Sequence, residues 1–301
     1  MLHVDACAKT EAYVLMEQGV KTRLRRMLGV RMDEQPRFGL IIVGDEILSG
    51  KRLDKHFAKV IELLGARGLR LDWAQYLPDD RARLVEALRR SFTLGDHVFS
   101  CGGIGSTPDD HTRQAAGEAL GLKIRLHPEA AELIAARCRD LAAQGLGSAD
   151  MSTAENRQRL KMGEFPVGSS IIPNPYNRIA GFALERHWFV PGFPVMAWPM
   201  IEWVLETHYA AWFHRVPMAE RSLIVFDTPE SAIAPLMEQV ESRFPTIKAF
   251  SLPSVGDGSD GRMARRHIEL GVKGAGANLD AAFMQLRAAV AQMGAAFEDN
   301  G

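Results

Sequence analysis

The chain has little cysteine and no long apolar run. Its three cysteines, Cys7, Cys101 and Cys138, show no CxxC spacing, so the sequence predicts neither a disulfide framework nor a cysteine-based zinc site. No apolar segment approaches the roughly 20 residues that span a bilayer, and the first residues lack the basic-then-apolar order of a secretory signal. We therefore expect a cytoplasmic protein without a membrane partner.

The chain also has no excess of positive or negative side chains. The chain carries 36 lysines and arginines against 37 aspartates and glutamates, which gives a formal charge of −1. This balance provides no general basic surface for a nucleic-acid backbone, so a nucleic-acid partner is not expected. The hydrophobic fraction of 47% is that of an ordinary globular protein.

Residues 1–36 are expected to lie outside the folded domains. Basic residues crowd this stretch, but no helix or strand period in it matches a core face. The acidic side chains Glu11 and Glu17 argue against a transit peptide. We interpret the segment as an N-terminal extension that is disordered or not native, and a basic targeting arm or amphipathic helix is the alternative.

Residues 37–210 have the pattern of an α/β domain. The apolar run from Phe38 to Val43 predicts a buried strand, and a helical pattern over 54–66 follows it. Strand patterns over 69–76 and 97–101 enclose a further helix, for which Asp79 or Asp80 is a suitable N-cap. This βαβαβ alternation predicts a mainly parallel sheet covered on both faces.

Residues 218–298 are expected to form a second, smaller domain. Strand, helix, two strands and a last helix over 278–297 give a βαββα order, which is typical of a small α+β domain.

Two loops carry the chemistry of the first domain. One runs from Gly44 to Gly50 after the first strand, and the other from Gly102 to Thr112 after the third. In a doubly wound sheet such loops meet at the topological switch point, where these folds bind ligands. We therefore expect them to form one site.

The second loop has the composition of a phosphate-binding turn. The amides of Gly102, Gly103 and Gly105 can approach an anion closely, aided by Thr107 and the following helix N-terminus. No Gly-Lys-Ser/Thr triplet follows, so the loop is not a P-loop. The alternative is that these are turn glycines and that the aspartates that follow them cap the helix.

The carboxylates of the two loops predict a divalent cation such as Mg²⁺. Phosphate does not tolerate so many carboxylates unaided, and a hard cation that bridges both groups resolves the conflict. We assign the metal to Asp45 and Asp109, because Asp54 can be a helix cap. Asn156 lies on a helical face that either reaches ligand phosphates or is solvated.

The loops resemble the signatures of the molybdopterin-binding domain family, most closely its CinA-like branch. The resemblance rests on 44–50 with Asp54, on 102–112, and on Asn156, 174–175 and 190–194, and it covers about residues 38–206. It implies a three-layer MogA-like domain, self-association into a homo-oligomer, and metal-dependent hydrolysis of diphosphates of the ADP-ribose type. Molybdopterin is a further ligand that the family implies.

The expected site combines the loop analysis with this resemblance. Asp109 and Asp110 are the expected catalytic residues, with Asp109 positioning or deprotonating water. The expected ligand-binding residues are Gly44, Glu46, Ser49, Gly50, Gly102, Gly103, Gly105, Ser106, Thr107, Thr112, Asn156 and Asn174.

The sequence departs from the family pattern at several positions. His56 stands where Asn is usual, Ser106 where Pro is usual, and 176–180 replace Gly-Thr-Ala-Pro. The amide-hydrolysing C-terminal domain of full CinA proteins is not expected in this chain. Two main functions follow: a nucleotide diphosphate pyrophosphatase, or a module that binds molybdopterin or a nucleotide without turnover. A purely structural oligomerisation protein is a third.

Overall fold

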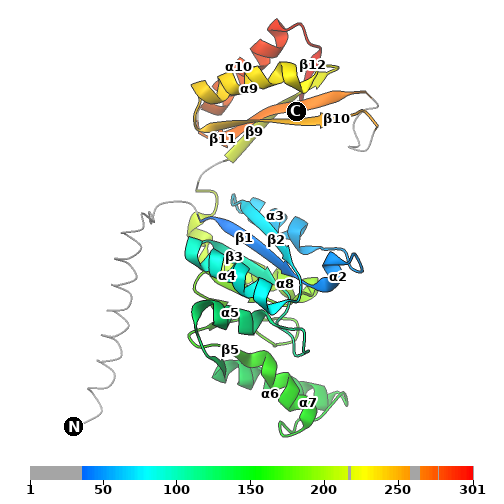
Figure 1. Cartoon of the computed structure of the whole chain (residues 1–301), viewed down its shortest axis with the longest axis vertical. Helices are drawn as coiled ribbons and strands as arrows, with labels where there is room; N and C mark the ends of the chain where they lie inside the picture. Colours follow the sequence, from blue (N-terminus) through cyan, green and yellow to red (C-terminus); the bar gives the residue numbers. More distant parts are fainter. Residues whose placement is uncertain (1–35, 216–217, 258–264, 277, 301) are drawn as a thin grey trace, which may run out of the picture. The chain divides into compact units, whose positions relative to one another are not determined.

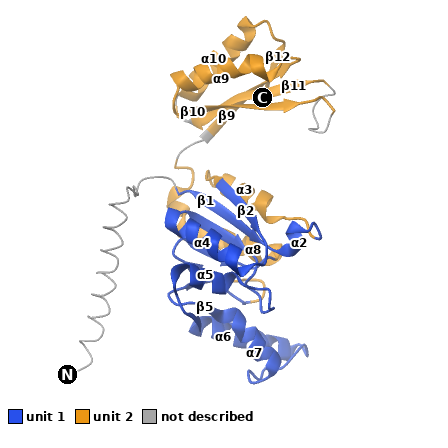
Figure 2. Cartoon of the chain, in the orientation of Figure 1, with its two compact units in different colours: residues 1–51, 72–172, 178–192 blue, residues 52–71, 173–177, 193–301 orange. Residues whose placement is uncertain are grey.

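The computed structural model describes residues 36–215, 218–257, 265–276 and 278–300 (Figure 1). These residues divide into two compact units, coloured separately in Figure 2. Unit 1 comprises 1–51, 72–172 and 178–192, and unit 2 comprises 52–71, 173–177 and 193–301. The expected N-terminal extension lies outside the described residues except for Pro36. Domains at 37–210 and 218–298 stay a prediction.

A six-stranded sheet in the order β2-β1-β3-β8-β7-β6 forms the centre of unit 1. Its strands are β1 (Phe38–Val43), β2 (Leu71–Leu77), β3 (His97–Cys101), β6 (Ser170–Ile172), β7 (Gly181–Leu184) and β8 (His187–Val190). β3 pairs in parallel with both β1 and β8, whereas the β6–β7 and β7–β8 pairs are antiparallel. All six residues of β1 are buried, as expected for a central strand with an unbroken apolar run. The predicted α/β fold with a mainly parallel sheet is confirmed.

Helices cover a face of this sheet. Unit 1 contains α2 (Asp45–Leu48), α4 (Arg81–Leu94), α5 (Thr112–Leu120), α6 (Pro128–Ala143), α7 (Ala154–Leu160) and the 3-10 turn η1 (Lys161–Gly163). Leu84 and Leu88 of α4 join Ile41 and Val98 of the strands in one apolar core. A separate ribbon pairs β4 (Ile124–Leu126) with β5 (Glu164–Pro166). The turn that forms α2 and strand β7 were not expected from the sequence.

Both ends of α4 follow from its sequence. The Asp80 carboxylate accepts the amide of Arg83 at 2.9 Å and caps the N-terminus. Gly95 adopts φ 71 and ends the helix, because a left-handed residue at that position costs glycine no steric strain. Asp79, the other candidate cap, is therefore left for another role.

Unit 2 contains a helix pair and a four-stranded antiparallel sheet. The helices α3 (His56–Gly65) and α8 (Pro194–His208) pack together, and the turn η2 (Ala210–Trp212) follows. The sheet order is β10 (Ile247–Ser254), β11 (His267–Ala275), β9 (Met218–Phe226) and β12 (Phe297–Asn300). Helices α9 (Glu230–Arg243) and α10 (Asn278–Gln292) form a second apolar core with its strands.

The end of the chain differs from the sequence prediction. The last helix was expected over 278–297, but α10 ends at Gln292 and β12 pairs with β9. Gly294 adopts φ 72, which ends the helix and turns the chain back to the sheet. The order is therefore βαββαβ, not βαββα. None of the helices in the described part of the chain has the length and apolar character needed to cross a bilayer.

Candidate functional site

The two glycine loops of unit 1 lie at the same edge of the sheet. Each loop is hydrogen-bonded to the neighbouring strand where it begins: the amide of Gly44 donates to Leu77 O at 3.1 Å, and that of Gly102 donates to Val190 O at 3.0 Å. Because β1, β3 and β8 are parallel, their carboxyl ends share this edge. The two loops therefore lie at one edge, and that they form one site stays a prediction.

The first loop presents exposed polar side chains. Asp45, Glu46, Ser49 and Gly50 lie in and after the short helix α2, where Asp45, Glu46 and Ser49 are exposed. The backbone amide of Asp45 donates to Asp79 Oδ2 at 2.8 Å, and the amide of Asp79 donates in return to Asp45 Oδ1 at 3.4 Å. This reciprocal pair fixes the first loop to the end of β2.

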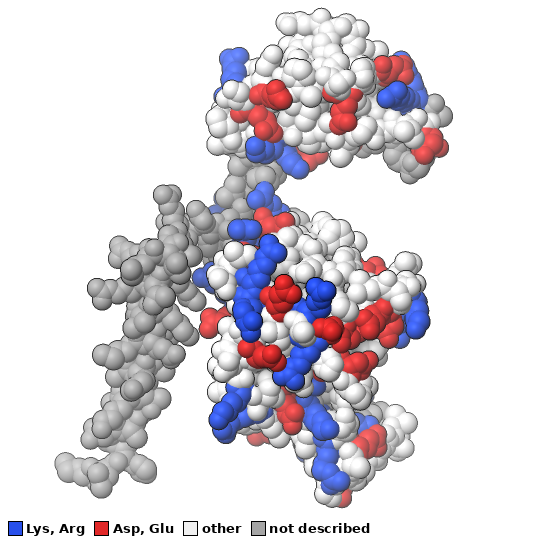
Figure 3. Space-filling view, viewed as in Figure 1, with Lys and Arg blue, Asp and Glu red and all other residues white. Residues whose placement is uncertain are grey.

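Four carboxylates gather at this edge, and Figure 3 shows acidic side chains near α2. Burial raises the pKa of Asp79, and the negative charges of Asp45, Asp109 and Glu46 raise it further, against the lowering effect of the Asp45 amide. Asp79 was not among the expected site residues. Its position after β2, with Asp80 already capping α4, is the signal that identifies it. We call Asp45, Glu46, Asp79 and Asp109 the acidic group.

Glycine is required where the second loop begins. Gly102 adopts φ 108, and a Cβ there would lie 2.4 Å from Val43 O. Gly103 adopts φ 69, and a Cβ there would lie 2.2 Å from Thr112 Oγ1. Thr112 is fully buried, and its hydroxyl and amide donate to Gly102 O and Gly103 O at 3.0 Å each. Thr112 therefore closes the base of the loop and does not face a ligand.

The Asp110 carboxylate occupies the inside of the second loop. It accepts the amides of Gly105 and Thr107 at 2.8 Å each and the Thr107 hydroxyl at 2.5 Å. Gly102 donates to Val190, so only Gly103 among the three expected phosphate donors has an amide without a hydrogen-bond partner within the described chain. The glycine amides expected to form a free anion-binding nest are therefore largely occupied, because the Asp110 carboxylate of the same loop fills that nest.

Neither loop aspartate caps α5. The N-cap of α5 is His111, and no side chain bonds to the helix amides there. Asp109 is exposed, and Thr107, its own backbone amide and the neighbouring His111 stabilise its charged form, so the pKa of its carboxyl lies below the usual value. Asp109 is thus an ionised carboxylate that faces solvent, whereas Asp110 braces the loop.

A cavity of about 370 Å³ opens beside the second loop. Ser106, Thr107 and Asp110 line it from the loop, and Lys161 and Gln158 line it from η1 and α7. The Gln158 amide donates to Ser106 O, which holds the loop against α7. The loop and α7 therefore enclose a space bordered by hydroxyl, amide, ammonium and carboxylate groups.

Arg113 connects the walls of this cavity. It is 3% exposed, and it donates to Gly105 O and to Lys161 O at 2.6 Å each. Burial lowers the pKa of its guanidinium, while the charges of Asp110 and Glu164 oppose that shift. Sequence analysis missed Arg113, because a helix residue three positions after an aspartate gives no signal of burial.

Asn156 lies inside unit 1. Its side chain is 1% exposed, and its amide nitrogen donates to Ser148 O at 2.7 Å and to Asp150 O at 2.9 Å. Its oxygen accepts the Arg159 guanidinium at 2.6 Å. Its side chain is used to hold the turn before α7, so it does not face a ligand in this conformation.

Asn174, Asp54 and His56 belong to unit 2. Asn174 is 5% exposed and closes a turn, with its oxygen accepting the amide of Tyr176 at 3.0 Å and its nitrogen donating to Asn177 Oδ1 at 2.9 Å. Asp54 accepts the amides of His56 at 2.7 Å and Phe57 at 3.1 Å at the start of α3, while the N-cap position itself is Lys55.

Asp45 and Asp109, the expected metal ligands, do not by themselves complete the coordination of a metal ion. Within the described residues, no three histidine, cysteine, aspartate or glutamate side chains are arranged to hold a metal ion. Asp45 and Asp109 are connected through their shared neighbour Asp79, whose pKa both raise. Any cation at this edge would need further oxygen ligands from another molecule.

Comparison with known proteins identifies the family. Residues 39–211 match the model of a probable molybdopterin binding domain. The chain is 31% identical to a CinA-like protein of Citrifermentans bemidjiense over 67% of its length, which is 47% of that relative. It is 28% identical to a protein of Aeropyrum pernix over 74% of its length and 81% of the relative. The chain thus spans about half the length of the CinA-like relative.

Solved structures of two further proteins are similar to part of the chain. The CinA protein of Thermoplasma acidophilum is 25% identical, with a TM-score of 0.48 over 56% of this chain and 97% of its own. The molybdopterin biosynthesis enzyme MoaB of Thermus thermophilus is 21% identical, with a TM-score of 0.38 over 59% of this chain and 94% of its own. From the family match and its CinA-like relatives, the chain belongs to the CinA-like branch of the molybdopterin-binding domain family.

Proposed function

We propose that the protein binds a nucleotide diphosphate of the ADP-ribose type and hydrolyses its diphosphate with a divalent cation. The observation that carries the proposal is the acidic group at the carboxyl edge, where burial and then the charges of Asp45, Asp109 and Glu46 raise the pKa of Asp79. Carboxylates held together against their repulsion are suited to a cation. The cavity beside the same loop, with Lys161 on its wall, is suited to an anion.

The acidic group fits a cation that also binds the substrate. Mg²⁺ is commonly held by one or two carboxylates, with phosphate oxygens and water completing its octahedron. The lack of three preformed ligands among the described residues agrees with that mode. Asp45 and Asp109 would hold the ion, and Asp79 would support them. When bound, the cation would neutralise charge that develops on the diphosphate.

The protein groups have distinct proposed roles. Lys161 and Ser106, which line the cavity, would bind phosphate oxygens there. The free amide of Gly103, at the start of the same loop, would be a further donor. Asp109, with its lowered pKa, would orient the attacking water, because a weak base removes a proton poorly. Asp79, with its raised pKa, is the better general base of the two. Asp110 would shape the loop and would not take part in proton transfer.

The second candidate is a protein that binds molybdopterin or a nucleotide without turnover. The family match favours it, since that match concerns binding and no particular reaction. The filled nest of the second loop also favours it, because Asp110 repels an anion that approaches those amides. Both candidates use the same edge of the sheet.

The test measures turnover and binding together. The full chain is incubated with ADP-ribose or FAD and Mg²⁺ or Mn²⁺, and AMP is quantified by chromatography, while calorimetry measures binding. We expect AMP from the parent protein and a loss of at least about 100-fold for Asp45→Asn and Asp109→Asn. Glu129→Gln, an exposed carboxylate of α6, is the matched control and should behave as the parent.

The outcomes separate the candidates. Metal-dependent binding without AMP would contradict hydrolysis and support the binding module. If both aspartate variants bind metal and nucleotide as the parent does, the cation site is wrong.

A further inference from the structure

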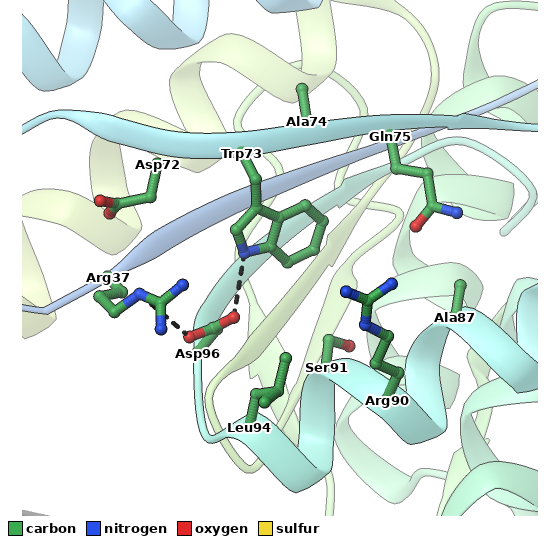
Figure 4. A pocket seen from close by; sticks show the side chains of 10 residues that line it. All are labelled: Arg37, Asp72, Trp73, Ala74, Gln75, Ala87, Arg90, Ser91, Leu94 and Asp96. Atoms are coloured by element: carbon green, nitrogen blue, oxygen red, sulfur yellow. Dashed lines mark hydrogen bonds and ion pairs between the residues drawn. The ribbon is translucent and has the colours of Figure 1, made fainter.

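A second cavity of about 360 Å³ lies between β2 and α4, at the edge of the sheet opposite the glycine loops (Figure 4). Arg37 and Asp96, which line it, directly precede β1 and β3. The glycine loops instead follow these strands. β1 has six residues at about 3.3 Å each, so roughly 20 Å of strand separates the two edges. The cavity is therefore distinct from the proposed catalytic site.

Trp73 forms a fixed aromatic wall of this cavity. Its indole lies against Gly39 of β1, where a Cβ would be 2.1 Å from the ring. Its Nε1 donates to Asp96 Oδ2 at 3.0 Å, and Asp96 is only 2% exposed. Glycine below the ring and a buried carboxylate at its edge hold the ring in one orientation, so a ligand that stacks on it would not have to immobilise it first.

The acidic side chains that line the cavity are already used. Asp96 accepts the indole and lies 3.8 Å from Arg37 Nε. Asp72 accepts the amide of Phe38 at 2.9 Å, and its side chain points away from Trp73 in Figure 4. The Ser91 hydroxyl donates to Leu88 O and contacts His187 Nε2 at 2.7 Å, so it too is occupied. These hydrogen bonds hold the three groups in place, and the Arg37 guanidinium partly offsets the charge of Asp96.

Arg90 supplies a positive charge on the other wall. It is exposed on α4 and forms no ion pair with any residue in the described ranges. Figure 4 shows its guanidinium extending from α4 toward Gln75 and the Trp73 ring, with the Gln75 amide pointing back. A cation and an amide thus lie beside a flat apolar surface, and both can donate hydrogen bonds.

We propose that this cavity binds a small planar aromatic anion. The ring of the ligand would stack on Trp73, and its carboxylate or phosphate would accept hydrogen bonds from Arg90 and Gln75. The volume of about 360 Å³ lies at the lower end of small-molecule sites and suits one or two fused rings with a single anionic group. This site does not depend on the proposed hydrolysis.

The experiment uses 2-naphthoate as the probe and calorimetry on the full chain. We expect saturable binding of one equivalent. 2-Naphthamide has the same shape without the charge and should bind about tenfold more weakly, as should cyclohexanecarboxylate, which is not planar. 2-Naphthyl phosphate distinguishes a preference for phosphate from one for carboxylate.

Two arginines of α4 give matched variants. Arg90→Gln should weaken 2-naphthoate binding about tenfold, because it removes the charge and keeps much of the length of the side chain. Arg89→Gln changes the adjacent exposed arginine, which does not line the cavity, and should bind within about twofold of the parent. Both positions are exposed on a helix, so both variants should fold.

Three outcomes would overturn the inference. They are the absence of saturable binding for both naphthyl anions, equal binding of 2-naphthamide and 2-naphthoate, and equal binding by Arg90→Gln and Arg89→Gln. ADP-ribose hydrolysis reports on the other edge of the sheet, and its failure leaves these results unaffected.

Discussion

The loop after β1 and the loop after β3 differ in where their polar groups point. In the first loop Asp45, Glu46 and Ser49 are exposed, and Asp45 reaches across the edge to the amide of Asp79. In the second loop Thr112 and Asp110 bind the backbone of their own loop. The first loop displays these side chains, whereas the second uses Asp110 and Thr112 to hold its shape and leaves Asp109 exposed. Polar residues in a glycine-rich motif therefore divide into those that face a ligand and those that build the loop.

The largest expected effect comes from two glycines with similar backbones. Gly103 and Gly50 have φ values of 69 and 74, but a Cβ meets Thr112 Oγ1 at 2.2 Å in the first case and nothing within 4 Å in the second. Gly103→Ala should cost about 3 kcal/mol, since overpacking adds to backbone strain. Gly50→Ala should cost about 1 kcal/mol from strain alone. Urea denaturation of both variants measures the difference. Equal costs would show that the second loop is not tightly packed.

The two neighbouring aspartates give the next effect. Asp110→Asn removes a charge and an acceptor oxygen from a carboxylate that accepts three hydrogen bonds, so it should cost about 2 kcal/mol. Asp109 is exposed, so Asp109→Asn should leave the urea midpoint of the metal-free protein nearly unchanged.

Hydrogen exchange checks the location of that effect. The amides of Gly105 and Thr107 should exchange faster in Asp110→Asn than in the parent protein. Their exchange rates should be unchanged in Asp109→Asn. If both variants exchange alike, the two carboxylates do not have separate roles.

The smallest effect concerns repulsion in the acidic group. The pKa of Asp79 is raised above 3.8, so its ionisation is less favourable in the folded state than in the unfolded state, and it opposes folding above that pH. Asp79→Asn keeps an acceptor for the Asp45 amide and should stabilise the metal-free protein at pH 7 by a few tenths of a kcal/mol, about 0.5 at most. The gain should shrink toward pH 3, where the parent carboxyl is protonated. A destabilised variant would mean that the bond to Asp45 outweighs the repulsion.

The sequence was sufficient to place the two glycine loops at one edge of the sheet but not to assign every side chain in them. The apolar runs 38–43 and 97–101 are central strands, so their periodicity located both glycine loops at one edge. Asp110 and Thr112 bind inward because of a turn that only the folded loop shows. Asn156 matches the family motif, yet four hydrogen bonds hold its side chain within unit 1.

Other differences have local causes. Asp79 and Asp80 are equally good caps by residue type, and only the helix geometry assigns the cap to Asp80. Strand β12 was missed because its sequence, Phe-Glu-Asp-Asn, has little strand propensity and depends on pairing with β9.

Arg113 has a mechanical consequence for the cavity beside the second loop. A single rigid guanidinium holds the carbonyl of Gly105 and the carbonyl of Lys161, which lie far apart in the chain but share one planar group. A ligand that displaces the loop at Gly105 must either break a charge-assisted bond or move Lys161 with it. The positions of the second loop and of Lys161 are thereby coupled. We expect these two walls of the cavity to move together when a ligand binds.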